Sequence, residues 1–251
     1  MPDTLERIPP GESPLYAQVR ARLIEAIAAG EWRPGEAIPS EADLARAFGV
    51  AIGTIRKAVD ALVAERALVR RQGRGTFVTA HEGSRLLFHF FHIVAGDGRK
   101  VVPQVSTVGF ERDRATRETA AALAIAPHDK VVRIRNVLSL EGRARIVDDI
   151  TLPAELFPGL TEKVFVARNN TIYNLYQSRF GINVLRTDER LRAVLADEGL
   201  AALIGVAPGA PLLEIRRVAL TFRDRPVELR ISRVDTSEHH YHNTLGKDLV
   251  A

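Results

Sequence analysis

The chain of 251 residues contains no cysteine, which excludes disulfides, thiolate zinc sites and cysteine nucleophiles. Its opening, MPDTLERIPPG, has acids and prolines where a signal peptide would need an apolar run. No stretch approaches the ~18 uninterrupted apolar residues of a membrane span. There is also no G-x-S-x-G motif, no P-loop and no dinucleotide fingerprint. We therefore expect a cytoplasmic protein that has no membrane segment and no cofactor.

Histidines occur in two groups that could suggest a metal site. His89 and His92 lie near the middle of the chain, and His239, His240 and His242 lie near its end. Metal ligation requires convergent side chains, usually with a further histidine or acidic ligand. Neither group matches a known ligand spacing, so we predict no metal.

Residues 39–62, PSEADLARAFGVAIGTIRKAVDAL, have the pattern of a helix-turn-helix. Ser40 and Asp43 form an S-x-x-D capping box at the start of a first helix. Gly49 follows this helix at a position where the left-handed conformation is common. The second helix repeats apolar residues at Ile55, Val59 and Leu62. Its polar positions near the N-terminal end are those that a recognition helix presents to DNA.

After the second helix, the segment ALVRRQGRGTFV predicts a two-stranded hairpin with a basic, glycine-rich tip. Residues 44–80 carry seven Lys or Arg against two acids, as expected where a protein meets phosphates. An isolated charge run would more often be a solvated face, but this one coincides with a helix-turn-helix. The combination predicts a winged helix.

The runs PLYAQV, RPGEAIPSEADLARAFGV, TIRKAVDAL and RRQGRGTFV resemble the DNA-binding domain of the GntR family of bacterial transcription regulators. The resemblance covers residues 1–80. Ala51 and Ile52 stand where the family usually has Ser-Arg, so a capping hydroxyl and a DNA-contacting arginine are both missing. The resemblance implies that Arg56 reads a base, guanine by preference, or clamps a phosphate. The remaining residues expected at the DNA interface are Ser40, Thr54, Lys57, Arg70, Arg71, Gly73 and Arg74.

The polar segment AHEGS predicts a linker, which we place at residues 81–85, and residues 86–251 form a second domain. Alternating apolar residues predict strands at 86–94, 101–112, 130–141, 144–152, 184–195, 211–223 and 227–235. Helices are expected at 117–124, at 171–180 with Asn170 as cap, and at 198–204. The fold class is therefore α+β with an antiparallel sheet. The second domain resembles UTRA, the effector-binding domain of HutC-type GntR regulators, which shares its fold with chorismate lyase.

The candidate ligand contacts in this second domain are mainly charged side chains on its predicted strands. Arg133 and Arg135 share one strand face, where two guanidinium groups can bind a carboxylate or phosphate. Balancing nearby acids is an equally good explanation of this pair. Of Asp148 and Asp149 only one can face inward, and we favour Asp148. The predicted ligand-binding set also includes Phe88, Glu228 and Arg230. Solvated charge on the strand surface is an equally good explanation of Glu228 and Arg230.

The sequence thus predicts a homodimeric transcription regulator that binds a double-stranded DNA operator and is released by a small anionic metabolite. Two alternatives stay open. The second domain could be an enzyme acting on a small carboxylate, although no acid-base pair is identifiable. The chain could also be a constitutive DNA-binding dimer without an effector.

Overall fold

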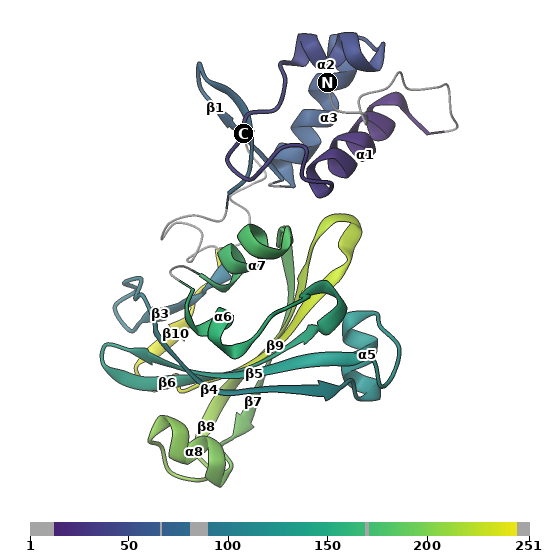
Figure 1. Cartoon of the computed structure of the whole chain (residues 1–251). Helices are drawn as coiled ribbons and strands as arrows, with labels where there is room; N and C mark the ends of the chain where they lie inside the picture. The colour runs from purple at the N-terminus through teal and green to yellow at the C-terminus, as the bar shows by residue number, and fades with distance from the viewer. Residues whose placement is uncertain (1–12, 66, 81–89, 169–170, 245–251) are drawn as a thin grey trace. The chain divides into compact units, whose positions relative to one another are not determined.

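The computed structural model describes residues 13–65, 67–80, 90–168 and 171–244 of an α+β chain (Figure 1). The chain divides into two compact units. The first contains residues 1–82 together with residues 170–186 and 221–224, and the second contains the remainder. Phe88, His89 and the expected linker at 81–85 lie outside the described residues.

The first unit contains a winged helix. Its elements are α1 (Leu15–Ala28), α2 (Glu41–Phe48), α3 (Ile52–Ala64), β1 (Leu68–Arg71) and β2 (Gly75–Val78). Strands β1 and β2 pair antiparallel. The apolar faces of the three helices enclose a core that includes Leu23, Leu44, Phe48, Ile55 and Leu62, all fully buried. The helical spacing of these residues brings one face of each helix to the same core.

Two helix starts in this unit differ in their caps. The Ser40 side chain accepts a hydrogen bond from the backbone N–H of Asp43 and caps α2. Gly49 ends α2 in the left-handed conformation at φ 66°. Helix α3 begins after Ala51 without any side-chain cap. The cap on the first helix and the missing cap on the second were both predicted.

The second unit is built on a six-stranded sheet with the order β4-β5-β6-β9-β8-β7. The strands are β4 (Gln104–Arg114), β5 (Lys130–Leu140), β6 (Arg143–Pro153), β7 (Arg186–Leu195), β8 (Pro211–Leu220) and β9 (Pro226–Val234). Each corresponds to one predicted strand between residues 101 and 235. The pairings β4–β5, β5–β6, β6–β9 and β8–β9 are antiparallel.

Shorter elements complete the chain. They are β3 (Ile93–Ala95), β10 (His239–Tyr241), α5 (Arg117–Leu123), α6 (Glu162–Val166), α7 (Ile172–Phe180), α8 (Glu198–Ile204), η1 (Ala154–Leu156) and η2 (Phe222–Asp224). Of the strand expected at 86–94, residues 86–89 lie outside the described residues, residues 90–92 are not in a strand, and only Ile93 and Val94 belong to one, β3. β10 was missed, although it pairs with β3. Thr171, rather than the expected Asn170, caps α7.

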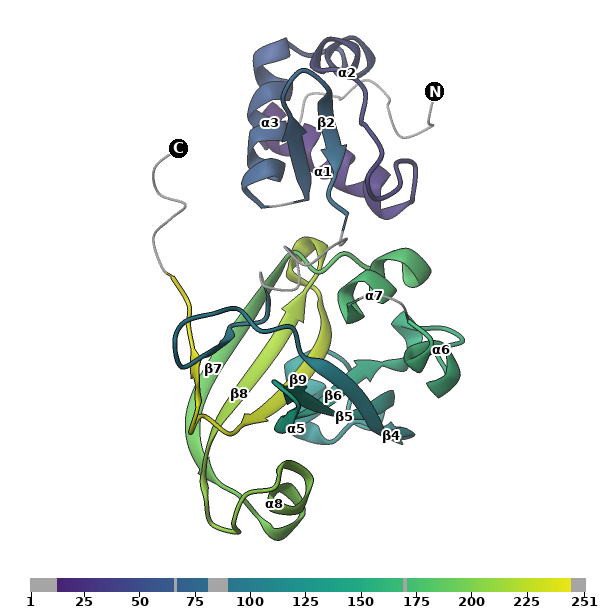
Figure 2. The ribbon, with the colours of Figure 1, turned by 90° about the vertical axis from the view of Figure 1, so that its left-hand side faces the viewer.

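The two faces of the six-stranded sheet, named here the Asp148 face and the Asp149 face, are covered differently (Figure 2). On the Asp148 face, the β3–β10 ribbon packs over a cluster that includes Leu138, Ile146 and Val234. Phe165 of α6 meets Phe110 of β4 on the same face, with ring centroids 6.5 Å apart. On the Asp149 face, α8 packs near Val147 and α5 near Val131. The sheet is therefore sandwiched, with different elements on its two sides.

Candidate DNA-binding surface and effector site

The recognition-helix residues predicted to meet DNA lie on the side of α3 opposite its buried stripe. Arg56 and Lys57 are exposed and Thr54 is half-buried, whereas Ile55 and Val59 have no exposed surface. Arg56 donates from Nε to Glu41 Oε2 of α2 at 3.1 Å. The Lys57 ammonium lies 4.1 Å from the ring centroid of Tyr16, a cation-π contact with α1.

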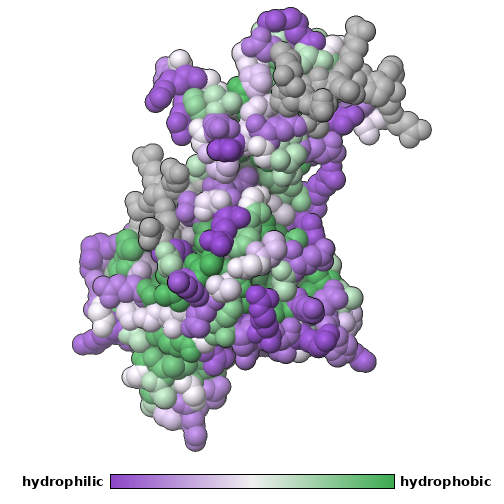
Figure 3. Space-filling model, viewed as in Figure 1, coloured by the Kyte–Doolittle hydropathy of each residue, from purple (hydrophilic) through white to green (hydrophobic). Residues whose placement is uncertain are grey.

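The wing is a basic hairpin with a glycine turn. Gly73 has a φ of 68°, which a residue with a side chain adopts at a cost. Arg71 lies over the Phe77 ring at 4.5 Å, and Arg70 pairs with Glu41 at 3.0 Å and also with Asp60. Figure 3 shows mainly hydrophilic residues over this hairpin and over α2. The exposed residues at the wing include Arg70, Arg71, Gln72, Gly73 and Arg74.

A surface groove brings the start of α2 and the wing together. Its lining includes Ser40, Glu41, Arg70, Arg71 and Arg74. Exposed arginine-carboxylate pairs contribute little stability, ~0–1 kcal/mol each, so these arginines can exchange a carboxylate for a phosphate at low cost. The predicted DNA-contacting residues therefore come from three places, the start of α2, α3 and the wing, and Glu41 links these through Arg56 and Arg70.

Ser40 has a structural task within this surface. Its hydroxyl donates to Asp43 Oδ2 at 2.6 Å while accepting the Asp43 N–H. The hydrogen bond from Ser40, with a smaller contribution from Arg46, holds the pKa of Asp43 below its usual value. Ser40 therefore fixes the start of α2, where Glu41 is the first helical residue.

The residues predicted for the ligand site do not all lie together. Cross-strand partners share a sheet face, and Arg135 pairs with Asp149 whereas Asp148 pairs with Asn136. Arg133 and Arg135 do share a face, as predicted, but it is the Asp149 face. The reason is a register shift between Leu138 and Ser139, because one extra residue in a strand moves every later side chain to the opposite face.

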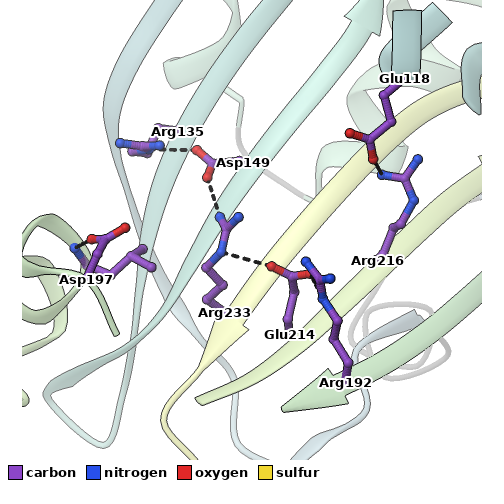
Figure 4. Close-up of polar contacts among 9 residues, drawn as sticks. Glu118, Arg135, Asp149, Arg192, Asp197, Glu214, Arg216 and Arg233 are labelled. Atoms are coloured by element: carbon purple, nitrogen blue, oxygen red, sulfur yellow. Dashed lines mark hydrogen bonds and ion pairs between the residues drawn. The ribbon is translucent and has the colours of Figure 1, made fainter. Parts of the chain in front are cut away.

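On the Asp149 face the two arginines belong to ion pairs. Arg133 Nε lies 2.7 Å from Asp113, and Arg135 Nε lies 2.6 Å from Asp149. Figure 4 shows the second pair continuing across the sheet, from Asp149 to Arg233 and on to Glu214. With half of its side-chain surface exposed, Arg135 is part of a solvated charge ladder. The alternative explanation for these arginines, the balancing of nearby acids, describes their contacts in this structure.

The other predicted residues lie close together on the Asp148 face. Asp148 is 3% exposed and Glu228 is 0% exposed. Arg230 lies between them, 3.3 Å from Asp148 and 2.9 Å from Glu228. Of the two neighbouring aspartates, Asp148 is the buried one. The guanidinium offers hydrogen-bond donors and the two buried carboxylates offer acceptors, so this buried group contains both kinds of polar atom.

Asn136 extends this buried group and was missed by sequence reasoning. It has no exposed surface, it is the cross-strand partner of Asp148, and its Oδ1 accepts a hydrogen bond from Thr107 Oγ1 at 2.9 Å. Its Nδ2 group is buried and has no hydrogen-bond partner among the residues that the structure describes. Buried polar atoms are nearly always satisfied, so an unpaired donor beside Asp148 suits a polar ligand atom. The available signal was an amide in the stretch VVRIRNVL, at a position that alternates with the apolar Ile134 and Leu138.

A second buried polar cluster adjoins the first. Arg217 is the cross-strand partner of Arg230 and pairs with Glu189 at 2.5 Å. Tyr241 also donates to Glu189, and burial together with this carboxylate raises the pKa of Tyr241 well above its usual value. Arg217 is thereby held by Glu189 of β7, which Tyr241 of β10 also contacts, and it lies beside Arg230 on the neighbouring strand.

The structure also bears on metal and membrane sites. Among the described residues, no three His, Cys, Asp or Glu side chains are grouped as metal ligands would be. Within the same part of the chain, no helix is long and apolar enough to cross a membrane. His89 is outside the described residues, so the predicted absence of a metal stays a prediction.

A winged helix with an exposed basic surface, in one chain with a sheet unit that contains a buried polar site, defines a ligand-responsive DNA-binding transcription regulator. The family models agree with this class. The model described as "Bacterial regulatory proteins, gntR family" matches residues 15–78, and the UTRA domain model matches residues 98–240. The chain belongs to the GntR family and carries a UTRA domain.

Two relatives and one solved structure match this chain over most of their own length. The chain is 30% identical to the "Probable fructoselysine utilization operon transcriptional repressor" of Shigella flexneri, over 86% of this chain and 88% of that protein. It is 30% identical to the histidine utilization repressor of Pseudomonas aeruginosa, over 82% of this chain and 81% of that protein. A solved ligand-binding domain of a protein described as a GntR-family regulator from Bordetella bronchiseptica is 36% identical, with a TM-score of 0.61. That match covers 62% of this chain and 98% of the solved one.

Proposed function

We propose that this protein is a cytoplasmic, homodimeric repressor that binds an inverted-repeat operator and is released by a small polar metabolite. The observation that carries the proposal is the exposed set of arginines on α3 and the wing, above all Arg56. In a two-fold dimer the recognition helices would enter successive major grooves, with half-sites roughly 10 bp apart or less. Arg56 reads a base, and Thr54, Lys57, Arg70, Arg71 and Arg74 position the DNA backbone.

The effector binds on the Asp148 face of the sheet. Asp148 and Glu228 accept hydrogen bonds from its hydroxyl or amino groups, and Arg230 together with the Asn136 amide donates to its anionic or carbonyl group. The relatives named above repress genes for the use of fructoselysine and histidine, which are polar metabolites of this kind. Arg133 and Arg135 are not part of this proposed site, because they lie on the other face in ion pairs. Phe88 is kept as a candidate contact from the sequence.

Binding assays test this function directly. The wild-type protein should shift an inverted-repeat operator in a gel, and the effector should abolish the shift. In a thermal-shift screen of polar metabolites, a binder at a hundred times its Kd should stabilise the protein by about 2.7 kcal/mol without being consumed. Product formation in the same samples would instead support the enzyme alternative. Operator binding that no metabolite changes would support a constitutive regulator.

Dimerisation is supported by an exposed apolar edge of the six-stranded sheet. Val102, Val105 and Val108 lie on or just before β4, an edge strand, and are 60%, 42% and 51% exposed. A long edge strand with apolar side chains is a ready site for pairing with another chain. In analytical ultracentrifugation, Val105→Lys should shift the protein toward monomer, whereas the matched change Val166→Lys on α6, at a residue 55% exposed, should not. Equal sedimentation of both variants and the wild type would place the dimer contact elsewhere.

A further inference from the structure

One carboxylate connects the start of α2, the recognition helix and the wing. Glu41, the first residue of α2, accepts from Arg56 on α3 at 3.1 Å through one oxygen, and from Arg70 on β1 at 3.0 Å through the other. Its side chain is 26% exposed, compared with 63% for Arg56 and 45% for Arg70. Glu41 is thus the least exposed member of this group, and the two cations extend outward from it.

The atoms used in these contacts matter for base recognition. Arg56 is held through Nε, and in the described part of the chain no side chain pairs with its two Nη groups. Arginine recognises guanine by donating two parallel hydrogen bonds to O6 and N7. A carboxylate at Nε therefore leaves the outer edge of the guanidinium ready for a bidentate contact. It also restricts a side chain that otherwise loses ~2 kcal/mol of rotamer entropy when it is fixed.

We propose that Glu41 is a specificity-determining positioning residue for operator recognition. It orients Arg56 toward a base edge and links the wing to the same surface through Arg70. Its negative charge also opposes binding of the same surface to phosphates of any sequence, which lowers the affinity for random DNA. The proposal rests on the DNA-binding function above. It states that Glu41 sets the ratio of the affinity for operator DNA to the affinity for random DNA.

The alternative role for Glu41 is structural. An acid in the first turn stabilises a helix through the helix dipole, and Glu41 lies directly after the Ser40 cap. A residue with that role alone would change the stability of the domain and leave the ratio of specific to non-specific affinity unchanged. The ratio therefore separates the two roles, and urea unfolding of each variant reports whether the fold is intact.

The test compares Glu41→Gln with Asp60→Asn by fluorescence anisotropy on operator and random duplexes at several salt concentrations. Asp60 is the matched control, because it is an exposed acid on α3 that pairs with Arg70 but not with Arg56. Glu41→Gln should raise the affinity for random DNA and lower the operator-to-random ratio about tenfold, within the range that one bidentate base contact supplies. Asp60→Asn should raise both affinities together and keep the ratio.

Two further variants complete the experiment. In an Arg56→Ala background, Glu41→Gln should no longer change the ratio, because its effect acts through Arg56. Glu41→Asp keeps the charge on a shorter side chain, so the ratio should fall while the salt dependence stays close to that of the wild type. Equal ratios for wild type and Glu41→Gln, or an unchanged effect in the Arg56→Ala background, would overturn the proposal. Failure of the wild type itself to prefer any duplex is a different result and would overturn the DNA-binding function.

Discussion

Arginine-carboxylate pairs occur in both units, but in opposite surroundings. In the winged helix, the Arg56 and Arg70 side chains are 63% and 45% exposed. In the sheet unit, the Arg230 side chain is 13% exposed and its partners Asp148 and Glu228 are 4% and 0% exposed. The same chemical pair can therefore serve two purposes. Exposed pairs can be exchanged for contacts with DNA, whereas buried pairs are part of the fold and change only when another polar group takes a partner's place.

The largest expected effect comes from breaking the buried group. Arg230→Ala would leave Asp148 and Glu228 buried without their cation, and removal of one partner from a buried pair costs about 3–5 kcal/mol. We expect a loss of this size in the free energy of unfolding, measured by urea denaturation followed by circular dichroism. A loss of unfolding free energy below ~1 kcal/mol would show that water reaches Asp148 and Glu228. The contrast between buried ion pairs in the sheet unit and exposed ones in the winged helix would then be false.

The second effect concerns operator recognition. Arg56→Ala removes the one residue assigned to a base edge, so the discrimination between operator and random duplex should fall by about 1–3 kcal/mol. Competition binding with the two duplexes measures this difference. Arg46→Ala is the control, because Arg46 is an α2 arginine whose side chain is 79% exposed and which, among the described residues, forms an ion pair only with Asp43. Selectivity that survives Arg56→Ala would show that another residue reads the base.

A smaller effect is expected at the start of α2. Ser40→Ala removes the cap and should destabilise the protein by about 1 kcal/mol in urea unfolding at pH 7. The hydrogen bond from Ser40 lowers the pKa of Asp43 in the folded state. A lowered carboxyl pKa gives stability that is present above the unfolded value and is lost as the pH falls through the folded value. The difference between variant and wild type should therefore shrink on acidification below about pH 4, near the ordinary aspartate pKa.

NMR titration of the Asp43 carboxyl provides the direct check on this cap. In Ser40→Ala its pKa should rise toward the ordinary aspartate value. An unchanged pKa would mean that Arg46, rather than Ser40, controls the charge of Asp43.

The smallest effect is expected on the Asp149 face. Arg135→Ala removes a half-exposed member of the charge ladder, so its cost in urea unfolding should stay below ~1 kcal/mol. Isothermal titration with the identified effector should give the same affinity for this variant as for the wild type. A large loss of effector affinity would place the ligand on the Asp149 face and restore the interpretation based on Arg133 and Arg135.

Most of the architecture could be predicted because it follows from local periodicity. A period of two predicted all six strands of the large sheet, and it predicted that only one of Asp148 and Asp149 is buried. The cap at Ser40 and the glycine stop at Gly49 are likewise local features. The short strand β10 could not be found this way, because three residues are too few to show a period and its partner β3 is distant in the sequence.

The composition of the ligand site depends on information that periodicity lacks. Which residues share a face across β5 and β6 is set by the register of the hairpin, and this register changes between Leu138 and Ser139. If the pairing of Ser139 with Ala144 continued without a shift, Arg135 would be opposite Asp148. The observed shift places Asn136 there instead. A bulge has no reliable sequence signal, so Arg133 and Arg135 were grouped with Asp148 and Asn136 was overlooked.

The register of the β5–β6 hairpin also has a consequence for how such regulators can diverge. Insertions and deletions near a hairpin turn are usually among the mildest changes that evolution makes. In this hairpin, a one-residue deletion at Val137 of β5 would exchange the side chains of the preceding part of that strand between the two faces, bringing Arg135 beside Asp148 in place of Asn136. The loss of a single codon could therefore replace a neutral amide by a cation in the proposed effector site without altering the DNA-binding domain. Strand register is, in this sense, a heritable feature of the site that we propose.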